Sequence, residues 1–218
     1  MTVEIALLRH ARTTWNREGR LQGRADQPLD AAGRSEFEGA RAPAPWDAAA
    51  ILSSPLVRAR ETATLLAGRA AGVRIEPALV EMDLGRWEGR RGVELMASPE
   101  SGYRPIEAWS TLGGWAMRCP GGEGPGDVRA RLIPLFERLA EAGGRAVLVT
   151  HMNVIRTALA WAHGWAFDGP APFQIKRGRL YPLTLDRGVS IDRPPRAGGP
   201  IRLVAGAPVA PESARGAS

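Results

Sequence analysis

The chain has 218 residues, of which 44% are hydrophobic and 24% charged, which is typical of a globular protein with one ordinary core. Its net charge is +6 and its isoelectric point about 10.7, but the arginines are scattered, so a nucleic-acid partner is not expected. Cys119 is the only cysteine, and there is neither a membrane-length apolar run nor a secretory leader pattern. We therefore expect a cytoplasmic protein with no internal disulfide and no membrane partner.

The first half of the chain alternates between predicted strands and helices. Residues 3–8 form an apolar run that predicts a buried strand, and the polar segment 13–29 predicts a loop. Asp30 is placed to cap a helix that runs to about residue 41. The next predicted elements are a strand at 48–52, a helix at 53–71 and a short strand at 73–75.

The second half begins with a long irregular stretch. Residues 81–92 predict a loop, and around 90–126 we expect a lid or binding loop, with Trp109 and Trp115 as candidates to line a pocket. Asp127 is placed to cap a helix that Pro134 would kink. Strands are then predicted at 146–149, 174–179, 183–186 and 201–204, a helix at 154–163, and a disordered tail at 206–218. The alternation of strands and helices predicts an α/β fold with a largely parallel sheet.

Two histidines follow predicted strands directly. His10 comes after the first strand and His151 after the strand at 146–149, so a parallel sheet would bring both to the same edge. Arg9 precedes His10, Arg58 lies early in the helix after the second strand, and Glu81 opens a loop. The sequence therefore predicts a site with two histidines, two arginines and one carboxylate.

Such a set of side chains suits phosphoryl transfer. Catalysis of that reaction consists mostly of positioning and of stabilising negative charge, which arginines do well. A neutral imidazole can attack phosphorus, and nearby arginines help to keep it neutral. A carboxylic acid can then protonate the leaving oxygen and later accept a proton from water.

Several segments resemble, in the same order, the motifs of the histidine phosphatase superfamily, also called the phosphoglycerate mutase-like family. Leu8-Arg9-His10-Ala11 resembles its RHG motif, and Thr150-His151-Met152-Asn153 with Ile155-Arg156 resembles its second histidine motif. The other matches are Gly19-Arg20-Leu21-Gln22-Gly23-Arg24, Ser53-Ser54-Pro55-Leu56 with Arg58, Glu81-Met82-Asp83-Leu84-Gly85 and Pro120-Gly121-Gly122-Glu123. The resemblance covers residues 3–190 and implies one domain at 1–205, folded as a three-layer α/β/α sandwich around a mostly parallel sheet.

The resemblance also implies roles for individual residues. His10 is expected to be the phosphorylated nucleophile and Glu81 the general acid and base. The phosphate pocket is expected to contain Arg9, Arg58 and His151. Further contacts to a small phosphorylated substrate are expected from Asn16, Gln22, Gly23 and Met152. The resemblance implies no cofactor, and the sequence has no metal-ligand spacing.

The chain departs from the family pattern at three positions near the histidines. Ala11 stands where glycine is usual and Met152 where glycine is common, and we expect these side chains to narrow the pocket if glycine serves close backbone approach. Arg12 adds positive charge near the mouth. Glu123 has two interpretations, a solvated loop charge or a residue that supports the site.

Three functions are compatible with these observations. The first hypothesis is a metal-independent phosphatase that acts through a phosphohistidine. The segment of the chain from Glu81 to Pro120 is similar to that of α-ribazole phosphatases, which suggests α-ribazole 5'-phosphate as the substrate. The alternatives are a phosphoglycerate mutase and a non-catalytic protein that binds a phospholigand or nucleic acid. The last is motivated by Ala11, Met152 and the high isoelectric point. A homodimer is compatible with the sequence, which does not fix the oligomeric state.

Overall fold

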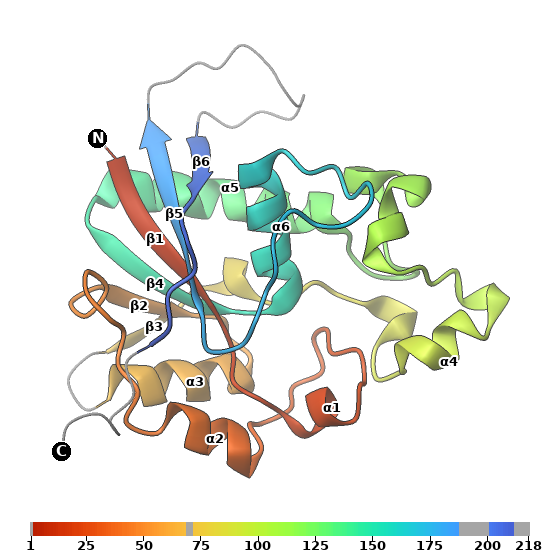
Figure 1. Cartoon of the computed structure of the whole chain (residues 1–218), viewed down its shortest axis with the longest axis horizontal. Helices are drawn as coiled ribbons and strands as arrows, with labels where there is room; N and C mark the ends of the chain where they lie inside the picture. The colour runs from red at the N-terminus through yellow and green to blue at the C-terminus, as the bar shows by residue number, and fades with distance from the viewer. Residues whose placement is uncertain (1, 69–71, 188–200, 212–218) are drawn as a thin grey trace.

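A six-stranded sheet forms the centre of the structure, a computed structural model that describes residues 2–68, 72–187 and 201–211 (Figure 1). The strands within these ranges are β1 (Thr2–Arg9), β2 (Ala50–Ser53), β3 (Val73–Ile75), β4 (Arg145–Thr150), β5 (Leu180–Arg187) and β6 (Ile201–Ala205). The α-helices are α1 (Thr14–Arg17), α2 (Ala31–Phe37), α3 (Val57–Ala67), α4 (Gly92–Met96), α5 (Pro125–Ala142) and α6 (Met152–His163). Short 3-10 helices are η1 (Pro77–Leu79), η2 (Gly85–Trp87), η3 (Pro99–Ser101), η4 (Ile106–Leu112) and η5 (Gly114–Ala116).

The strand order β3-β2-β4-β1-β5-β6 brings the ends of β1 and β4 together. Strands β1 to β4 are parallel, whereas β5 runs antiparallel to both β1 and β6. Arg9 pairs with Thr150, and the His10 backbone N–H donates to the Thr150 carbonyl at 2.9 Å. The register therefore sets His10 and His151 beside each other at the carboxyl edge of the sheet.

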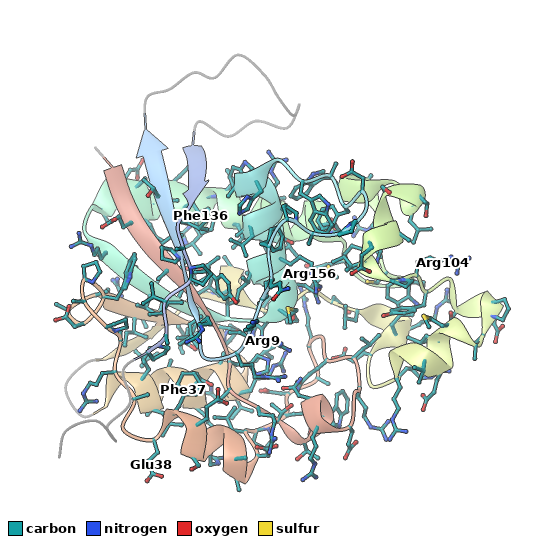
Figure 2. The ribbon with its side chains drawn as sticks, viewed as in Figure 1. Arg9, Phe37, Glu38, Arg104, Phe136 and Arg156 are labelled. Atoms are coloured by element: carbon teal, nitrogen blue, oxygen red, sulfur yellow. The ribbon has the colours of Figure 1, made fainter. Side chains whose placement is uncertain are left out.

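Side chains of β1 alternate between the two faces of the sheet, as a buried parallel strand requires. Ile5 and Leu7 pack in one apolar core with Phe136 of α5, and residues of α6 also belong to this core. Leu8 packs on the opposite face in a second core that contains Phe37 of α2 and the buried side of α3. Figure 2 shows Phe136 and Phe37 on opposite sides of the sheet. The predicted three-layer α/β/α architecture with a mostly parallel sheet is confirmed.

The segment between η2 and α5 extends to one side of the sandwich and contains α4 and three 3-10 helices (Figure 1). It is attached by aromatic side chains: Trp87 packs edge-on against the half-buried Tyr103, with ring centroids 5.2 Å apart, and the ring of Trp109 lies 5.8 Å from that of Phe167. The predicted irregular stretch is therefore packed against its neighbours through these aromatic contacts. Its expected role as a lid stays a prediction.

Helix boundaries differ from the sequence-based expectation in four helices. Helix α2 ends at Phe37 instead of about residue 41, and α6 begins at Met152 instead of residue 154. Helix α3 begins at Val57, because the backbone at Leu56 is still extended, and it ends before Gly68, whose φ is +60°. Residues 69–71 of the predicted helix lie outside the described residues. Helix α5 is capped at Gly124, and Asp127 instead accepts a hydrogen bond from the Gly124 N–H at 2.8 Å. The helix continues through Pro134.

The predicted strand at 174–179 is wrong, because the Tyr181 hydroxyl occupies backbone groups that a neighbouring strand would need. That hydroxyl accepts from the Lys176 N–H and donates toward the carbonyls of Gln174 and Lys176. The structure also differs from the predicted tail at 206–211, where Val209 exchanges two backbone hydrogen bonds with Leu180 (2.6 and 2.9 Å). Residues 212–218 of that tail lie outside the described residues.

Among the residues that the structure describes, no helix combines the length and the apolar character that crossing a membrane would require.

Replacing Phe136 with alanine tests the α5 side of the core. Phe136 is fully buried and stacks on Trp161 with a centroid distance of 6.1 Å. We expect Phe136→Ala to lower the free energy of unfolding by about 3–5 kcal/mol, from lost burial and the cavity it leaves. Glu38→Ala, at an exposed position after α2, should change it by no more than about 0.5 kcal/mol. Urea unfolding followed by circular dichroism measures both, and equal losses would contradict the assigned core.

Candidate active site

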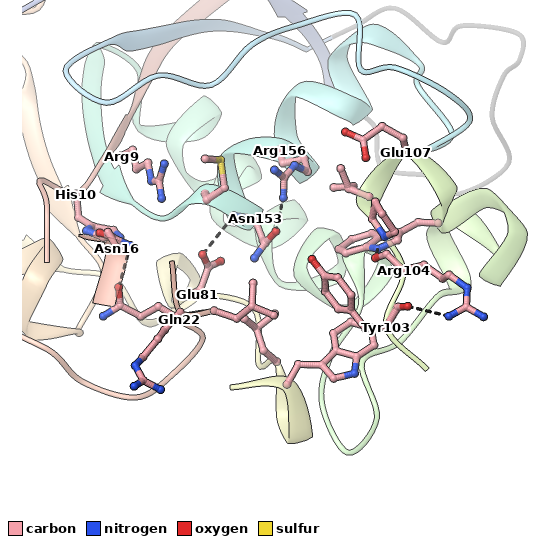
Figure 3. A pocket seen from close by; sticks show the side chains of 18 residues that line it. Arg9, His10, Asn16, Gln22, Glu81, Tyr103, Arg104, Glu107, Asn153 and Arg156 are labelled. Carbon is pink, nitrogen blue, oxygen red and sulfur yellow. Dashed lines mark hydrogen bonds between the residues drawn. The ribbon is translucent and has the colours of Figure 1, made fainter. Parts of the chain in front are cut away.

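A cavity of about 340 Å³ opens at the carboxyl ends of β1 and β4 (Figure 3). Its inner end is formed by groups from the sheet edge, and its outer wall by the segment that contains Tyr103 and Trp109. The residues that line it are Arg9, His10, Asn16, Arg20, Leu21, Gln22, Glu81, Leu84, Trp87, Tyr103, Arg104, Pro105, Ile106, Glu107, Trp109, Met152, Asn153 and Arg156.

The imidazole of His10 has a fixed tautomer. Its Nδ1 lies 2.7 Å from the backbone carbonyl oxygen of Ala11, which can only accept a hydrogen bond, so Nδ1 carries the proton. Burial, followed by the positive charges of Arg58 and Arg9, holds the pKa of His10 well below 6.5. The ring is therefore neutral at pH 7, and its Nε2 lone pair is available to attack an electrophile.

Arg9 brings a buried positive charge to the cavity. Burial, and then the positive charge of Arg177, lowers the pKa of Arg9 to about 9, so the guanidinium remains a cation at pH 7. Its buried Nε has no hydrogen-bond partner in the described residues. A buried donor without a partner costs free energy, which an anionic ligand in the cavity would recover.

Gln22 presents a second unpaired donor, and a chain of hydrogen bonds fixes its orientation. The Thr13 backbone N–H donates to the side-chain oxygen Oδ1 of Asn16 at 3.2 Å. The second polar atom of the Asn16 side chain is therefore the amide nitrogen Nδ2. That nitrogen lies 3.3 Å from Gln22 Oε1, and the Thr13 hydroxyl also donates to this oxygen at 3.0 Å. The buried Gln22 Nε2 is left without a partner among the described residues.

Glu81 is a buried carboxyl group with a raised pKa. Desolvation by burial is the main cause, and it outweighs hydrogen bonds from the backbone of Met82 (2.8 Å) and Asn153 (3.3 Å) and the charge of Arg58. A carboxyl group that stays protonated to higher pH can donate a proton to a leaving oxygen.

Arg58 and His151 are fully buried and are not among the residues that line the cavity, and their predicted role in a phosphate pocket stays a prediction. Arg58 Nε donates to His151 Nδ1 at 3.2 Å, and its terminal nitrogens donate to the carbonyls of Ala25 and Gly23 at 2.9 and 2.6 Å. His151 therefore carries its proton on Nε2, which donates to Ser54 Oγ at 2.7 Å. These bonds occupy both ring nitrogens of His151 and most of the Arg58 fork.

The two buried histidine rings are neighbours, with centroids 5.2 Å apart. Burial, followed by the charge of Arg58, holds the pKa of His151 well below 6.5. Arg58 therefore disfavours protonation of both imidazoles, and the arrangement keeps His10 in the nucleophilic form.

The remaining predicted contact residues divide into two groups. Asn16, Gln22 and Met152 line the cavity, whereas Gly23 does not. A Cβ on Gly23 would meet the backbone nitrogen of Leu84 at 2.9 Å, so glycine is needed for close packing against the Glu81 loop. Its carbonyl also accepts from Arg58.

Ala11 does not narrow the cavity, contrary to the expectation from the sequence. Its side chain packs in the core on the α2 and α3 side of the sheet, and its N–H donates to Thr62 Oγ1 at 2.9 Å. The methyl group therefore points away from the cavity. Met152 does line the cavity, so its side chain takes up space that glycine would leave open.

Glu123 supports the loop that carries Glu81. Its Oε2 accepts from the Asp83 N–H at 3.0 Å, and its own N–H donates to the Asp83 carbonyl at 2.8 Å. Its Oε1 forms an ion pair with Arg24 at 2.7 Å. Of the two interpretations of Glu123, support for the site agrees with these contacts.

Two groups of cavity residues were not assigned roles from the sequence. Asn153 and Arg156 line the cavity together with Met152 on one face of α6. Arg156 follows Asn153 by three residues and Met152 by four, a spacing that brings helical side chains together, so the sequence pattern could have indicated both residues. The stretch from Tyr103 to Glu107 has no such periodicity. Trp109 lines the cavity, but Trp115 packs against Phe167 instead, with centroids 5.1 Å apart.

In the described ranges, no cluster of three or more His, Cys, Asp or Glu side chains could hold a metal ion. The described side chains of the cavity include a neutral imidazole, a carboxyl group with a raised pKa, and the unpaired donors of Arg9 and Gln22.

The neutral histidines predict a loss of stability in mild acid. The unfolded chain binds protons on these imidazoles near pH 6.5, whereas the native state binds them only at lower pH, so the free energy of unfolding falls as the pH drops below 6.5. We expect His10→Gln to reduce this dependence by up to about 1.4 kcal/mol per pH unit. Urea unfolding at several pH values between about pH 5 and pH 8 measures how the free energy of unfolding depends on pH. His163→Gln, at an exposed position, should keep the wild-type dependence; an unchanged slope for His10→Gln would contradict the buried neutral state.

Comparison with known proteins agrees with this fold. Residues 5–191 match the model of the histidine phosphatase superfamily (branch 1). Over 153 residues the chain is 32% identical to the probable phosphoglycerate mutase GpmB of Cronobacter sakazakii. The aligned region covers 68% of this chain and 69% of that protein. The α-ribazole phosphatase of Shigella flexneri has a similar structure, with 27% identity, a TM-score of 0.62, and coverage of 85% of this chain and 91% of that chain. A mycobacterial glucosyl-3-phosphoglycerate phosphatase has 26% identity and a TM-score of 0.69, and covers 94% and 97% of the two chains. The resemblance in the motifs is thereby confirmed, and the chain belongs to the histidine phosphatase superfamily.

Proposed function

We propose that the protein is a phosphomonoesterase that transfers the phosphoryl group of a small ester to His10 and then to water, without a metal ion. The observation that carries this proposal is the fixed tautomer of His10, which turns the Nε2 lone pair toward a ligand while the ring stays neutral. The unpaired donors of Arg9 and Gln22 supply binding groups for phosphate oxygens.

The reaction has two steps. In the first, His10 Nε2 attacks phosphorus, a P–N bond forms, the P–O bond to the alcohol breaks, and Glu81 donates its proton to the departing oxygen. In the second, the ionised Glu81 takes a proton from water, whose oxygen attacks phosphorus and releases His10 and inorganic phosphate. Arg9 stays close to the phosphoryl oxygens throughout and stabilises their charge.

Arg58 and His151 are proposed to act on His10 through its surroundings. The Arg58 charge disfavours the imidazolium form of the nucleophile. It also lies close enough to the cavity to favour negative charge on a bound phosphate. Because the neutral imidazole is the reactive form, the effect of Arg58 on His10 keeps the nucleophile competent in mildly acidic solution as well as at neutral pH.

The nucleophile is tested by hydrolysis of p-nitrophenyl phosphate in the presence of EDTA. We expect wild-type activity to survive EDTA, and His10→Ala to lose it by about a thousandfold or more. His163→Ala, an exposed histidine at the end of α6, should keep full activity. Wild type mixed rapidly with substrate should also trap an acid-labile phosphoenzyme. Turnover by His10→Ala would refute the proposal, and binding without turnover in wild type would favour a phospholigand-binding protein.

The role of Glu81 is tested by changing the leaving group. We expect Glu81→Gln to slow hydrolysis of alkyl phosphates by about a hundredfold to ten-thousandfold, because alkoxides need a proton to depart. Phosphoryl transfer to His10 from 2,4-dinitrophenyl phosphate, whose leaving group needs no proton, should be affected much less. Burst kinetics on both esters separates this first step from the hydrolysis of the phosphoenzyme. Equal losses in the burst rate would argue that Glu81 only shapes the cavity.

Similar proteins suggest two substrates for this site. The structural similarity to an α-ribazole phosphatase suggests α-ribazole 5'-phosphate as the substrate. The similarity to relatives named phosphoglycerate mutase suggests a phosphoglycerate and a mutase reaction instead. An assay with 3-phosphoglycerate and 2,3-bisphosphoglycerate separates the two, since a mutase produces 2-phosphoglycerate whereas a phosphatase releases inorganic phosphate.

A further inference from the structure

Arg156 brings a second cation to the cavity, separate from Arg9 (Figure 3). It is on α6, one turn after Asn153, and its side chain donates to Asn153 Oδ1 at 2.6 Å. Its guanidinium faces the cavity, the residue is half-buried, and desolvation is the main cause that lowers its pKa. Arg156 therefore has several N–H donors in a cavity partly shielded from water.

This cation has no counter-ion within the part of the chain that the structure describes. Surface arginines such as Arg24 pair closely with carboxylates, but Arg156 forms no ion pair there. The nearest carboxyl groups that act on it are Glu81, whose own pKa is raised, and the exposed Glu107. A half-buried charge that lacks a counter-ion is only partly solvated, so an anionic group of a ligand would be stabilised beside it.

The position of Arg156 relative to Glu81 shows which part of a substrate it would meet. The Asn153 backbone N–H donates to Glu81 Oε2, and the Asn153 side chain accepts from Arg156. Asn153 thus links the proton donor to the cation. Because Glu81 protonates the ester oxygen in the proposed function, Arg156 lies on the side of the departing alcohol rather than on that of the phosphate.

We propose that Arg156 binds a carboxylate on the alcohol part of the substrate, close to the ester oxygen, and so selects phosphorylated hydroxy acids. The inference rests on the proposed function for the orientation of the ester. The planar guanidinium can bind both carboxylate oxygens at once, which a lysine cannot do. Esters of uncharged alcohols, among them α-ribazole 5'-phosphate, leave Arg156 without a partner and are the poorer substrates.

The test compares 3-phosphoglycerate with glycerol 3-phosphate, which carries a hydroxymethyl group in place of the carboxylate. For wild type we expect kcat/KM and the affinity measured by calorimetry to favour 3-phosphoglycerate by about tenfold to a hundredfold, the usual effect of a charged hydrogen bond. Arg156→Gln should bring both ratios near one, and Arg156→Lys should retain part of the preference. Arg60→Gln removes the same charge from an exposed position on α3 outside the cavity and should keep the wild-type ratios. Circular dichroism melting of each variant shows whether it is folded.

The outcomes separate this inference from the proposed function. If wild type hydrolyses both esters equally and binds them equally, Arg156 does not select a carboxylate, although the phosphatase proposal stands. An undiminished preference in folded Arg156→Gln would assign carboxylate recognition to another residue and overturn the inference. If neither ester is hydrolysed, the proposed function fails for these substrates, and the calorimetric ratios of wild type and the variants still decide whether Arg156 recognises the carboxylate.

Discussion

The parallel pairing of β1 with β4 is the constraint on which the site depends. It sets Arg9 opposite Thr150 and ties the His10 backbone to the Thr150 carbonyl, so the two histidines meet although they are far apart in the sequence. The apolar side chains on both faces of β1 belong to the two cores, so the strand that positions His10 is firmly packed on both sides. A shift of one residue in this register would turn every side chain of the strand to the other face and remove His10 from the cavity.

Positive charge around buried neutral groups gives the cavity its chemical character. Arg58 and Arg9 act on two imidazoles that stay neutral, and Arg156 interacts with a carboxyl group that resists ionisation. Each feature supports the others, because a protonated imidazole would repel the arginines and an ionised Glu81 would compete with an anionic substrate. The free protein thus holds more positive than negative charge in a poorly hydrated space, and this imbalance suits an anionic ligand.

Most of the architecture could be predicted from the sequence, because its strands are continuous apolar runs and its helices have clear apolar spacing. The failures have physical causes. The segment 174–179 has strand-like composition, but the Tyr181 hydroxyl takes its backbone groups. The residue types of the site were predicted, whereas the hydrogen bonds of the Arg58 guanidinium to His151 and to two backbone carbonyls were not. Sequence patterns give the position of a side chain along an element, whereas the choice among nearby acceptors depends on three-dimensional packing.

The cavity is built from two unlike parts of the chain. Its inner end comes from the sheet edge and the first turn of α6, whereas its outer wall, from Tyr103 to Trp109, belongs to a segment of short 3-10 turns held by aromatic contacts. Substitutions or insertions in that outer segment can change the shape offered to the alcohol while the register of β1 and β4 stays intact. The fold thereby divides a rigid chemical centre, fixed by strand pairing, from a rim whose shape is set by local turns.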